Sequence, residues 1–251
     1  MMNQNKALWY AKKIIAQIVT DVVNLEDINY TVPEVQTLLD GVTVGGHKIQ
    51  DELITLNQIK AWKFLFNCIE NHTFTVSRQF VLQLHNLVAC KEALKWGEFR
   101  DKNVFISGTD YMPPKPDELD KLWNELEQET ELLLNLDNKA KTDFVSSLKE
   151  TNLYRAAINL FAKMARIQFF FDGNKRTARM MMSGLLLANY YPMINVSAAR
   201  KLEFNQTMIG YYNSEQLNPV YSFLVSCLHQ SVVDEFELYD LHLFIKNDNL
   251  N

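Results

Sequence analysis

Residues 168–179 read QFFFDGNKRTAR, and the interpretation of the whole chain starts from this run. Within it, one carboxylate, a Gly-Asn turn and three cations stand directly before an apolar stretch that ends near Pro192. We expect a helix to begin at Gly173-Asn174, because the residues that follow are apolar on nearly all faces. The amide groups of its first turn would lack intrahelical partners and would point toward an anion.

The charged side chains of this run favour a site for phosphates and a metal ion. Lys175, Arg176 and Arg179 bring positive charge to the start of the helix, and the two arginines share one helix face. Asp172 precedes the helix and can hold a Mg²⁺ ion that bridges phosphates. The run is not a Walker A loop, because the second glycine and the Lys-Ser/Thr pair are absent. From the spacing alone, a solvated loop with ordinary surface cations remains the alternative interpretation.

Composition indicates an ordinary globular protein that is rich in helix. The chain has 251 residues, of which 47% are apolar and 22% are charged, and it contains only eight Gly and six Pro. Such a length suits one large domain with terminal additions. The net charge of -5 argues against a surface that coats nucleic acid, so we expect no nucleic-acid partner.

Cysteine usage and hydropathy predict a cytoplasmic protein. Cys68, Cys90 and Cys227 are scattered, without CxxC spacing or a nearby histidine, which predicts buried thiols in a reducing compartment. No stretch reaches the ~18 consecutive apolar residues of a membrane span. The apolar segment 14–23 is interrupted by polar residues and lacks a small-residue cleavage site. We therefore expect no membrane partner.

Helical periodicity dominates the chain. Thr31 and Glu34 have the spacing of a capping box, and Gly41 is expected to end the short helix that follows. Residues 42–48 are expected to form a small hairpin or an extended turn. The expected helices cover residues 5–24, 32–41, 50–70, 76–95, 117–136, 140–149, 152–167 and 174–190, with two or three more between residues 197 and 246.

A different pattern occupies residues 103–111. β-Branched and aromatic residues flank a Ser-Gly-Thr-Asp turn in this segment, and Pro113, Pro114 and Pro116 exclude a helix directly afterwards. The natural interpretation is a short β-hairpin.

The run at 168–179 resembles the Fic family motif, His-x-Phe-x-Asp/Glu-Gly-Asn-Gly/Lys-Arg-x-x-Arg. The matching positions are Phe170, Asp172, Gly173, Asn174, Lys175, Arg176 and Arg179. Other segments resemble the family in the same order along the chain, so the resemblance extends over residues 65–230. They are Leu84-His85, Gly97-Glu98-Phe99-Arg100, the Tyr-x-Pro-Pro-x-Pro run at 111–116, and Pro219 with Phe223 and Leu224.

The resemblance implies a mainly α fold, a Fic-type helical core with one short β-hairpin flap. It divides the chain into N-terminal helices at 1–64, a Fic core at 65–200 and C-terminal helices at 201–251. The N-terminal part would include an inhibitory helix at 32–41. A homodimer remains open.

The resemblance also implies an activity and roles for single residues. Fic proteins transfer a nucleoside monophosphate, usually AMP from ATP, to a Ser, Thr or Tyr hydroxyl of a target protein. Asp172 would bind Mg²⁺ at the α- and β-phosphates, and Gly173 and Asn174 would form the anion hole. Arg176 would contact the phosphates, Arg179 would contact the γ-phosphate, and Lys175 would complete the nucleotide site. The flap would align the target by strand addition through Val104, Phe105, Ile106, Ser107, Gly108 and Thr109.

The chain departs from the motif at its first residue. Gln168 stands at the position of the family's catalytic His, and an amide cannot accept the proton of the target hydroxyl. Losing a positioned base costs about 10²–10⁴-fold in rate, whereas the groups that bind nucleotide would be unaffected. Three possibilities stay open: a natural relative that only binds, another base, or a Gln introduced in place of a native His. His85 is expected to be structural.

Lys175 is a second departure, because Gly is commoner at that position of the motif. Lys also occurs in the Doc-like branch, whose members resemble kinases that present the γ-phosphate. A protein kinase and a non-catalytic nucleotide-binding regulator are therefore the alternative functions. Gly173 and Arg179 favour AMP transfer.

The segment before Gly41 resembles an inhibitory helix of the family, which ends in a Glu that pairs with the second motif arginine. Asp40 stands at the corresponding position, one methylene shorter than Glu, and Gln36 replaces the expected Ser/Thr. This interpretation predicts an Asp40–Arg179 ion pair. The alternative is that Asp40 merely ends a helix beside a glycine turn.

Overall fold

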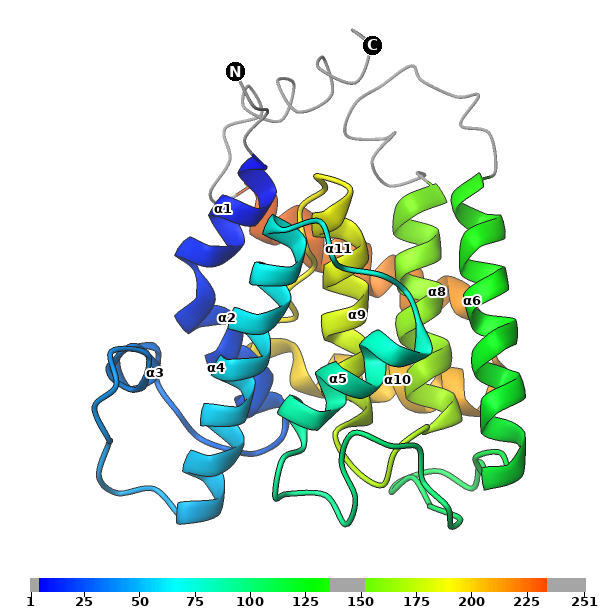
Figure 1. The fold of residues 1–251 in the computed structure, drawn as a ribbon, viewed down its shortest axis with the longest axis horizontal. Coiled ribbons are helices and arrows are strands. Elements are labelled where there is room, and N and C mark those ends of the chain that lie inside the picture. Colours follow the sequence, from blue (N-terminus) through cyan, green and yellow to red (C-terminus); the bar gives the residue numbers. More distant parts are fainter. Residues whose placement is uncertain (1–4, 136–151, 234–251) are drawn as a thin grey trace, which may run out of the picture.

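The structure is a computed structural model that describes residues 5–135 and 152–233, and the regular elements found there are helices (Figure 1). Two short 3-10 helices, η1 (Pro116–Glu118) and η2 (Ala198–Arg200), precede α6 and α10. The α-helices are α1 (Lys6–Lys13), α2 (Ile15–Leu25), α3 (Val32–Leu39), α4 (Ile49–Glu70), α5 (Arg78–Val88), α6 (Leu119–Asn135), α8 (Asn152–Ile167), α9 (Asn174–Ala188), α10 (Lys201–Ser214) and α11 (Leu217–Val233). The mainly α fold is thus confirmed.

Helix α9 lies at the centre of the bundle. It packs along α8, and α4 and α5 also lie against it (Figure 1). Met180, Met181 and Leu186 have no exposed surface, because neighbouring helices enclose α9 on nearly every side. Its N-terminus faces the lower end of Figure 1, where the segment between α5 and α6 also lies. Burial of the helix body therefore fixes the position of its first turn.

The helix expected over residues 5–24 is two helices. The backbone at Ile14 has φ -101° and ψ 18°, so α1 ends there and α2 begins. Asp21 on α2 accepts hydrogen bonds from Asn195 Nδ2 at 2.6 Å and from the Ala198 amide at 2.9 Å. Through these hydrogen bonds, the buried carboxylate of Asp21 connects α2 to the segment before α10.

Helix α3 begins as its sequence predicts. The Glu34 carboxylate accepts hydrogen bonds from the hydroxyl and the amide of Thr31, at 2.7 Å and 2.8 Å. These bonds, with a contact to His47, lower the pKa of Glu34 to about 2. The capping box is confirmed, whereas residues 42–48 form turns and not a hairpin.

The β-hairpin expected at 103–111 is wrong, because no strand occurs within residues 5–135 and 152–233. The segment is extended around a turn at Ser107-Gly108, and Gly108 has φ 83°. Two short strands without a third are marginally stable, and Pro113 and Pro114 offer no amide for a ladder. The hydroxyl of Thr109 instead donates to Asn213 Oδ1 on α10 at 2.7 Å, so the flap lies against that helix.

Some expectations concern residues outside the described ones, including the helix at 140–149 and the chain beyond residue 233. Among the described helices, none combines the length and the apolar character needed to cross a membrane.

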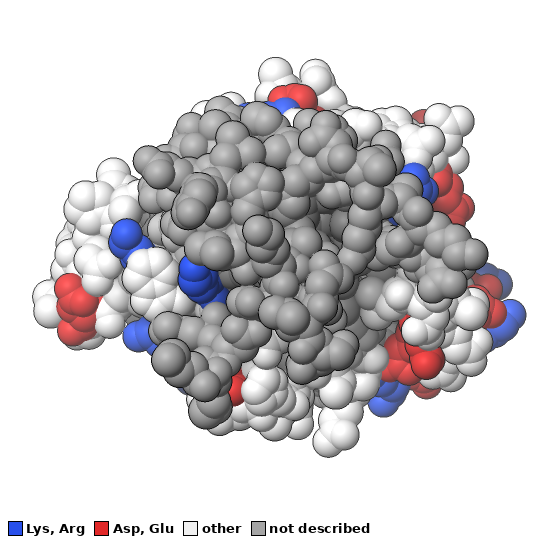
Figure 2. Space-filling model, turned by 90° about the horizontal axis from the view of Figure 1, so that it is seen from above, with Lys and Arg blue, Asp and Glu red and all other residues white. Residues whose placement is uncertain are grey.

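On the face shown in Figure 2, Lys and Arg side chains lie among Asp and Glu side chains along the edge formed by the described residues. Charges of both signs are therefore interspersed there.

Candidate functional site

The loop between α8 and α9 carries the site, and two left-handed residues shape it. Gln168 follows α8 with φ 55°, and Gly173 caps α9 with φ 70°. A Cβ at Gly173 would lie 3.3 Å from Val88 Cγ1 and 3.4 Å from Ala89 Cβ, so the loop backbone approaches the end of α5 closely. Glycine provides both the conformation and the space that this turn needs.

Asn174 holds the loop closed from inside. Its Oδ1 accepts a hydrogen bond from the Phe170 amide at 2.9 Å, and its Nδ2 donates to the Phe170 carbonyl at 2.8 Å. The same Nδ2 donates to Gln168 Oε1 at 2.9 Å. Because the side chain of Asn174 faces the loop, the amide groups of the first turn of α9 remain available for a ligand.

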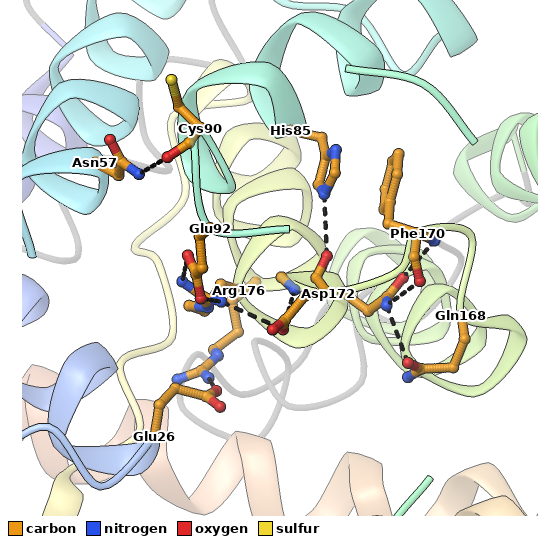
Figure 3. Close-up of polar contacts among 12 residues, drawn as sticks. Glu26, Asn57, His85, Cys90, Glu92, Gln168, Phe170, Asp172 and Arg176 are labelled. Carbon is orange, nitrogen blue, oxygen red and sulfur yellow. Dashed lines mark hydrogen bonds and ion pairs between the residues drawn. The ribbon is translucent and has the colours of Figure 1, made fainter. Parts of the chain in front are cut away.

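His85 supports the loop from α5. Its Nδ1 accepts from the Gly97 amide at 3.1 Å, so Nε2 carries the proton and donates to the Asp172 carbonyl at 3.0 Å (Figure 3). The ring also stacks on Phe170 with centroids 3.6 Å apart. Burial lowers the pKa of His85 to about 4, against a smaller opposing effect of the Asp172 carbonyl. His85 is thus a neutral anchor whose two nitrogens are both engaged, which supports the structural role expected for it.

Arg100 connects the loop to the flap. Its guanidinium donates to the carbonyls of Gln168 at 2.6 Å, Lys102 at 2.8 Å and Pro114 at 2.5 Å. The side chain is 2% exposed, and burial lowers its pKa. Arg100 thereby fixes both ends of the flap segment relative to the first residue of the motif.

Gln168 has its side chain turned toward the loop. Nε2 donates to the Ala165 carbonyl at 2.6 Å, and Oε1 accepts from Asn174 (Figure 3). Both ends of the amide are engaged within the protein. The Gln168 amide therefore stabilises the loop through contacts within the protein.

Asp172 is the only residue of the site whose carboxylate is largely exposed, at 60% of the side chain. Oδ1 accepts from the Gly173 amide at 2.5 Å and lies 3.4 Å from Arg176 Nη2. Oδ2 has no hydrogen bond to another described residue. Within the described residues, no group of three or more His, Cys, Asp or Glu side chains could hold a metal ion. One open carboxylate fits Mg²⁺ that takes its other ligands from phosphates and water.

Arg176 is paired with a carboxylate that the sequence did not point to. Both of its terminal nitrogens donate to Glu92, with Nη1 2.8 Å from Oε2 and Nη2 bonded to Oε1 (Figure 3). The two side chains are 4% and 9% exposed. Burial opposes the charge of Arg176, but the bonds to Glu92 outweigh it, and the pKa of Arg176 is raised.

Arg179 is paired with Glu26, which follows α2. Nη2 lies 3.1 Å from Glu26 Oε1, whereas Nη1 is buried and has no partner among the described residues. Burial lowers the pKa of Arg179, and Glu26 opposes this effect. Burial alone would raise the pKa of Glu26, but Lys175 and Arg179 outweigh it and the pKa is lowered. Lys175 makes no ion pair with another described residue.

The ion pair expected between Asp40 and Arg179 is not formed. Asp40 ends α3 and accepts a hydrogen bond from Gln36 Nε2 at 2.9 Å on an exposed surface. Glu26 occupies the position beside Arg179 instead, and Asp27 after it has φ 63°. Glu26 and Asp40 both end a helix before a left-handed residue, and the structure places Glu26 beside Arg179.

The structure thus brings together the predicted residues of the loop and adds Glu26, Glu92 and Arg100. The flap has no hydrogen bond from its tip to this loop among the described residues; Phe105 within it is 75% exposed. The flap is joined to the loop at its base, through Arg100.

Comparisons with known proteins identify a family that this chain resembles. The model of the Fic/DOC family matches residues 75–186. Protein adenylyltransferase Fic of Drosophila willistoni is 26% identical over 247 residues, which cover 97% of this chain and 45% of that protein. The protein of the same name from Drosophila melanogaster also shows 26% identity over 97% of this chain. The chain spans about half the length of these curated relatives.

Solved structures share the fold. A Fic domain containing signaling protein from Bacteroides thetaiotaomicron superposes with a TM-score of 0.72 at 18% identity, covering 93% of this chain and 90% of that one. Fic-1 from C. elegans gives a TM-score of 0.72 at 18% identity, covering 98% of this chain and 67% of that one. At such identities the likeness concerns the arrangement of helices.

Proposed function

We propose, because the model of the Fic/DOC family matches residues 75–186, that this chain binds ATP with Mg²⁺ at the loop of residues 172–179. We further propose that the site serves the transfer of AMP from ATP to a hydroxyl of a target protein, at a rate that Gln168 lowers. The name of the relatives, protein adenylyltransferase, supports this reaction class.

The observation that carries the proposal is the incomplete pairing of Arg179. A buried guanidinium needs its donors satisfied, and Nη1 of Arg179 has no partner in the described structure. The free amides at the start of α9 lie one turn earlier on the same helix, and Lys175 lies between them. Together these donors suit the several negative oxygens of a polyphosphate.

Asp172 would hold the metal ion in this arrangement. Its exposed carboxylate lies beside the first turn of α9, where the phosphates would be bound. Mg²⁺ bound there would neutralise part of the phosphate charge. With a single protein carboxylate in place, the ion would be bound weakly in the absence of nucleotide.

The low rate follows from Gln168. A base that accepts the proton of the target hydroxyl contributes about 10²–10⁴-fold in rate. The amide of Gln168 has no useful pKa, and its two ends bond Ala165 and Asn174. His85 does not replace the base, because its nitrogens bond Gly97 and Asp172 inside the protein.

The test is transfer of label from α-³²P-ATP to protein, comparing the chain with Gln168→His. His tolerates the left-handed conformation of this position better than most residues. We expect labelling to rise by about 10²-fold or more in Gln168→His. Gln168→Asn is the matched control, because it perturbs the same contacts without adding a base, and it should stay at the low level. Equal labelling of all three proteins would contradict the proposal.

A second candidate is a nucleotide-binding regulator without catalysis. The engagement of both ends of the Gln168 amide favours it, because the residue is built into the loop as a structural member. In that case Gln168→His would bind ATP yet transfer no label. Transfer of label from γ- but not from α-labelled ATP would instead identify a kinase.

A further inference from the structure

Arg176 cannot offer a bidentate contact to a phosphate in this structure. Both of its terminal nitrogens donate to Glu92, and Nη2 is also 3.4 Å from Asp172 Oδ1. A guanidinium recognises phosphate through two parallel N–H groups, which are the groups that Glu92 already occupies. The Glu92 carboxylate therefore stands where phosphate oxygens would bind.

The two motif arginines differ in this respect. Arg179 has one contact with Glu26 at 3.1 Å, and its buried Nη1 has no hydrogen-bond partner among the described residues. Arg176 has no such free terminal nitrogen. The pKa values of the two arginines differ in the same sense. The bonds to Glu92 raise the pKa of Arg176, whereas burial lowers the pKa of Arg179. Arg176 is the more completely paired of the two.

Glu92 lies in the segment that follows α5, outside any helix. α5 ends at Val88, and residues 89–92 form turns in which Lys91 has φ 59°. The Glu92 amide bonds the Ala89 carbonyl at 3.1 Å, within the same turn. A change in the turn, or in the Glu92 rotamer, would release Arg176 while α5 and α9 keep their positions.

We propose that Glu92 is an internal competitor of the nucleotide's phosphates at Arg176 and sets the affinity of the site for nucleoside triphosphates. This inference rests on the proposed nucleotide site. Binding of a triphosphate exchanges the carboxylate of Glu92 for phosphate oxygens at the same guanidinium, so the affinity is lowered by the strength of the Glu92–Arg176 pair. Glu26 contacts the other arginine, Arg179, at 3.1 Å and does not touch Arg176.

The experiment measures ATP and AMP binding by calorimetry in the presence of Mg²⁺, for the chain and for Glu92→Gln. The amide keeps the shape of Glu92 and one acceptor for Arg176 but removes the charge. We expect ATP to bind at least about tenfold more tightly to Glu92→Gln, because a charge-assisted bidentate pair is replaced by one neutral contact. AMP should change less than about twofold, since its single phosphate would lie at the start of α9, ahead of Arg176.

Two further variants test whether the effect belongs to the Glu92 carboxylate itself. Glu98→Gln removes the same charge from the same loop. The exposed Glu98 has its Oε1 3.8 Å from Lys95 Nζ, so this substitution should leave ATP binding unchanged. Glu92→Asp keeps the charge and shortens the side chain by one methylene. It should fold even if Glu92→Gln does not, and it should bind ATP with intermediate affinity.

Each outcome decides the inference. Tighter ATP binding in Glu92→Gln or Glu92→Asp, without a matching gain for AMP or in Glu98→Gln, supports it. Unchanged or weaker ATP binding in both Glu92 variants overturns it, as do equal gains for ATP and AMP, which would indicate general relief of negative charge. Glu26→Gln separates this result from the proposed function: if it binds ATP while the Glu92 variants gain nothing, only the role of Glu92 fails. If neither the chain nor any of the variants binds ATP, the proposed nucleotide site is also refuted.

Discussion

Gly173 is the residue on which the geometry of the loop depends most. It combines φ 70° with close contacts to the end of α5, where a Cβ would lie 3.3 Å from Val88. For Gly173→Ala we expect a loss of about 1–3 kcal/mol in the free energy of unfolding, from the left-handed backbone and the crowding. ATP binding should weaken as well, because the amides of the first turn shift. Urea denaturation and calorimetry measure the two effects.

Gly41 provides the control for this substitution. It also has a left-handed backbone, with φ 83°, but a Cβ at this position would have no atom within 4 Å. Gly41→Ala should therefore lose about 1–2 kcal/mol of stability through the backbone alone and keep its ATP affinity. Unaltered ATP binding in Gly173→Ala would show that the first turn of α9 does not hold the phosphates.

His85 should make stability depend on pH. Its folded pKa is lowered to about 4 from an ordinary value of 6.5, because the ring is buried. Between these values the unfolded state binds more protons than the folded state, so stability rises with pH in this window and falls as the solution is acidified. The loss from pH 7 to pH 4 is about 3 kcal/mol for this residue. Urea denaturation across that range measures it.

His85→Gln is the control for the pH effect. Glutamine keeps an amide N–H that can reach the Asp172 carbonyl, but it does not titrate. The variant will be less stable overall, because it loses the stack on Phe170. Its stability should also change less between pH 7 and pH 5 than that of the chain. If the free energy of unfolding changed equally with pH in the two proteins, His85 would not be the group that causes the pH dependence.

At the scale of the helices, Gly184 allows α9 to pack closely against Phe74. A Cβ at this position would lie 2.2 Å from the ring of Phe74, so a side chain there must displace the ring. We expect Gly184→Ala to destabilise the protein by about 1–3 kcal/mol, although alanine favours helix by about 1 kcal/mol. Thermal or urea denaturation measures the net change in the free energy of unfolding from these two opposing effects.

Gly210 on α10 is the matched position for this test. Nothing lies within 4 Å of a Cβ placed there, and the residue is helical. Gly210→Ala should therefore stabilise the protein by up to about 1 kcal/mol. If both substitutions stabilised the protein to the same extent, the close packing of α9 against Phe74 would be refuted.

The elements that sequence predicts well are those fixed by neighbouring residues. The capping box of Thr31 and Glu34 and the helix over 152–167 depend on contacts three or four positions apart, and both are found. The hairpin at 103–111 depends on partners elsewhere in the chain, and Arg100 and Asn213 hold that segment in another form. Local pattern alone does not reveal such partners.

The same distinction applies to the site. The residues of the loop and the first turns of α9 are contiguous, so their spacing already places them together. The carboxylates that pair with the two arginines are distant in the chain: Glu92 is 84 positions from Arg176, and Glu26 is 153 positions from Arg179. Asp40 and Glu26 both end a helix before a left-handed residue, and only the packing of α2 distinguishes them.

At the scale of the whole molecule, the bundle joins the site to overall stability. α2 contributes Glu26, the turn after α5 contributes Glu92, and α9 carries both arginines at the centre of the fold. A ligand that binds only the folded chain stabilises all of these elements together.

MgATP should therefore raise the melting temperature of the chain. At a concentration of 100 times its dissociation constant, the ligand would add about 2.7 kcal/mol to the free energy of unfolding. Mg²⁺ alone should have little effect, because Asp172 is the one carboxylate open to it among the described residues of the loop. Asp172→Asn should lose the part of the shift that requires Mg²⁺. A shift that is the same with ATP and EDTA as with MgATP would argue against a metal at Asp172.

The most direct measurement of the nucleotide site is a crystal structure with ATP and Mn²⁺, whose anomalous signal locates the metal. We predict a triphosphate against the amides of Asn174 and Lys175, the metal ion beside Asp172, and Arg179 Nη1 bonded to a phosphate oxygen. A nucleotide bound elsewhere, with Arg179 Nη1 still unpartnered and no anomalous peak near Asp172, would contradict the account.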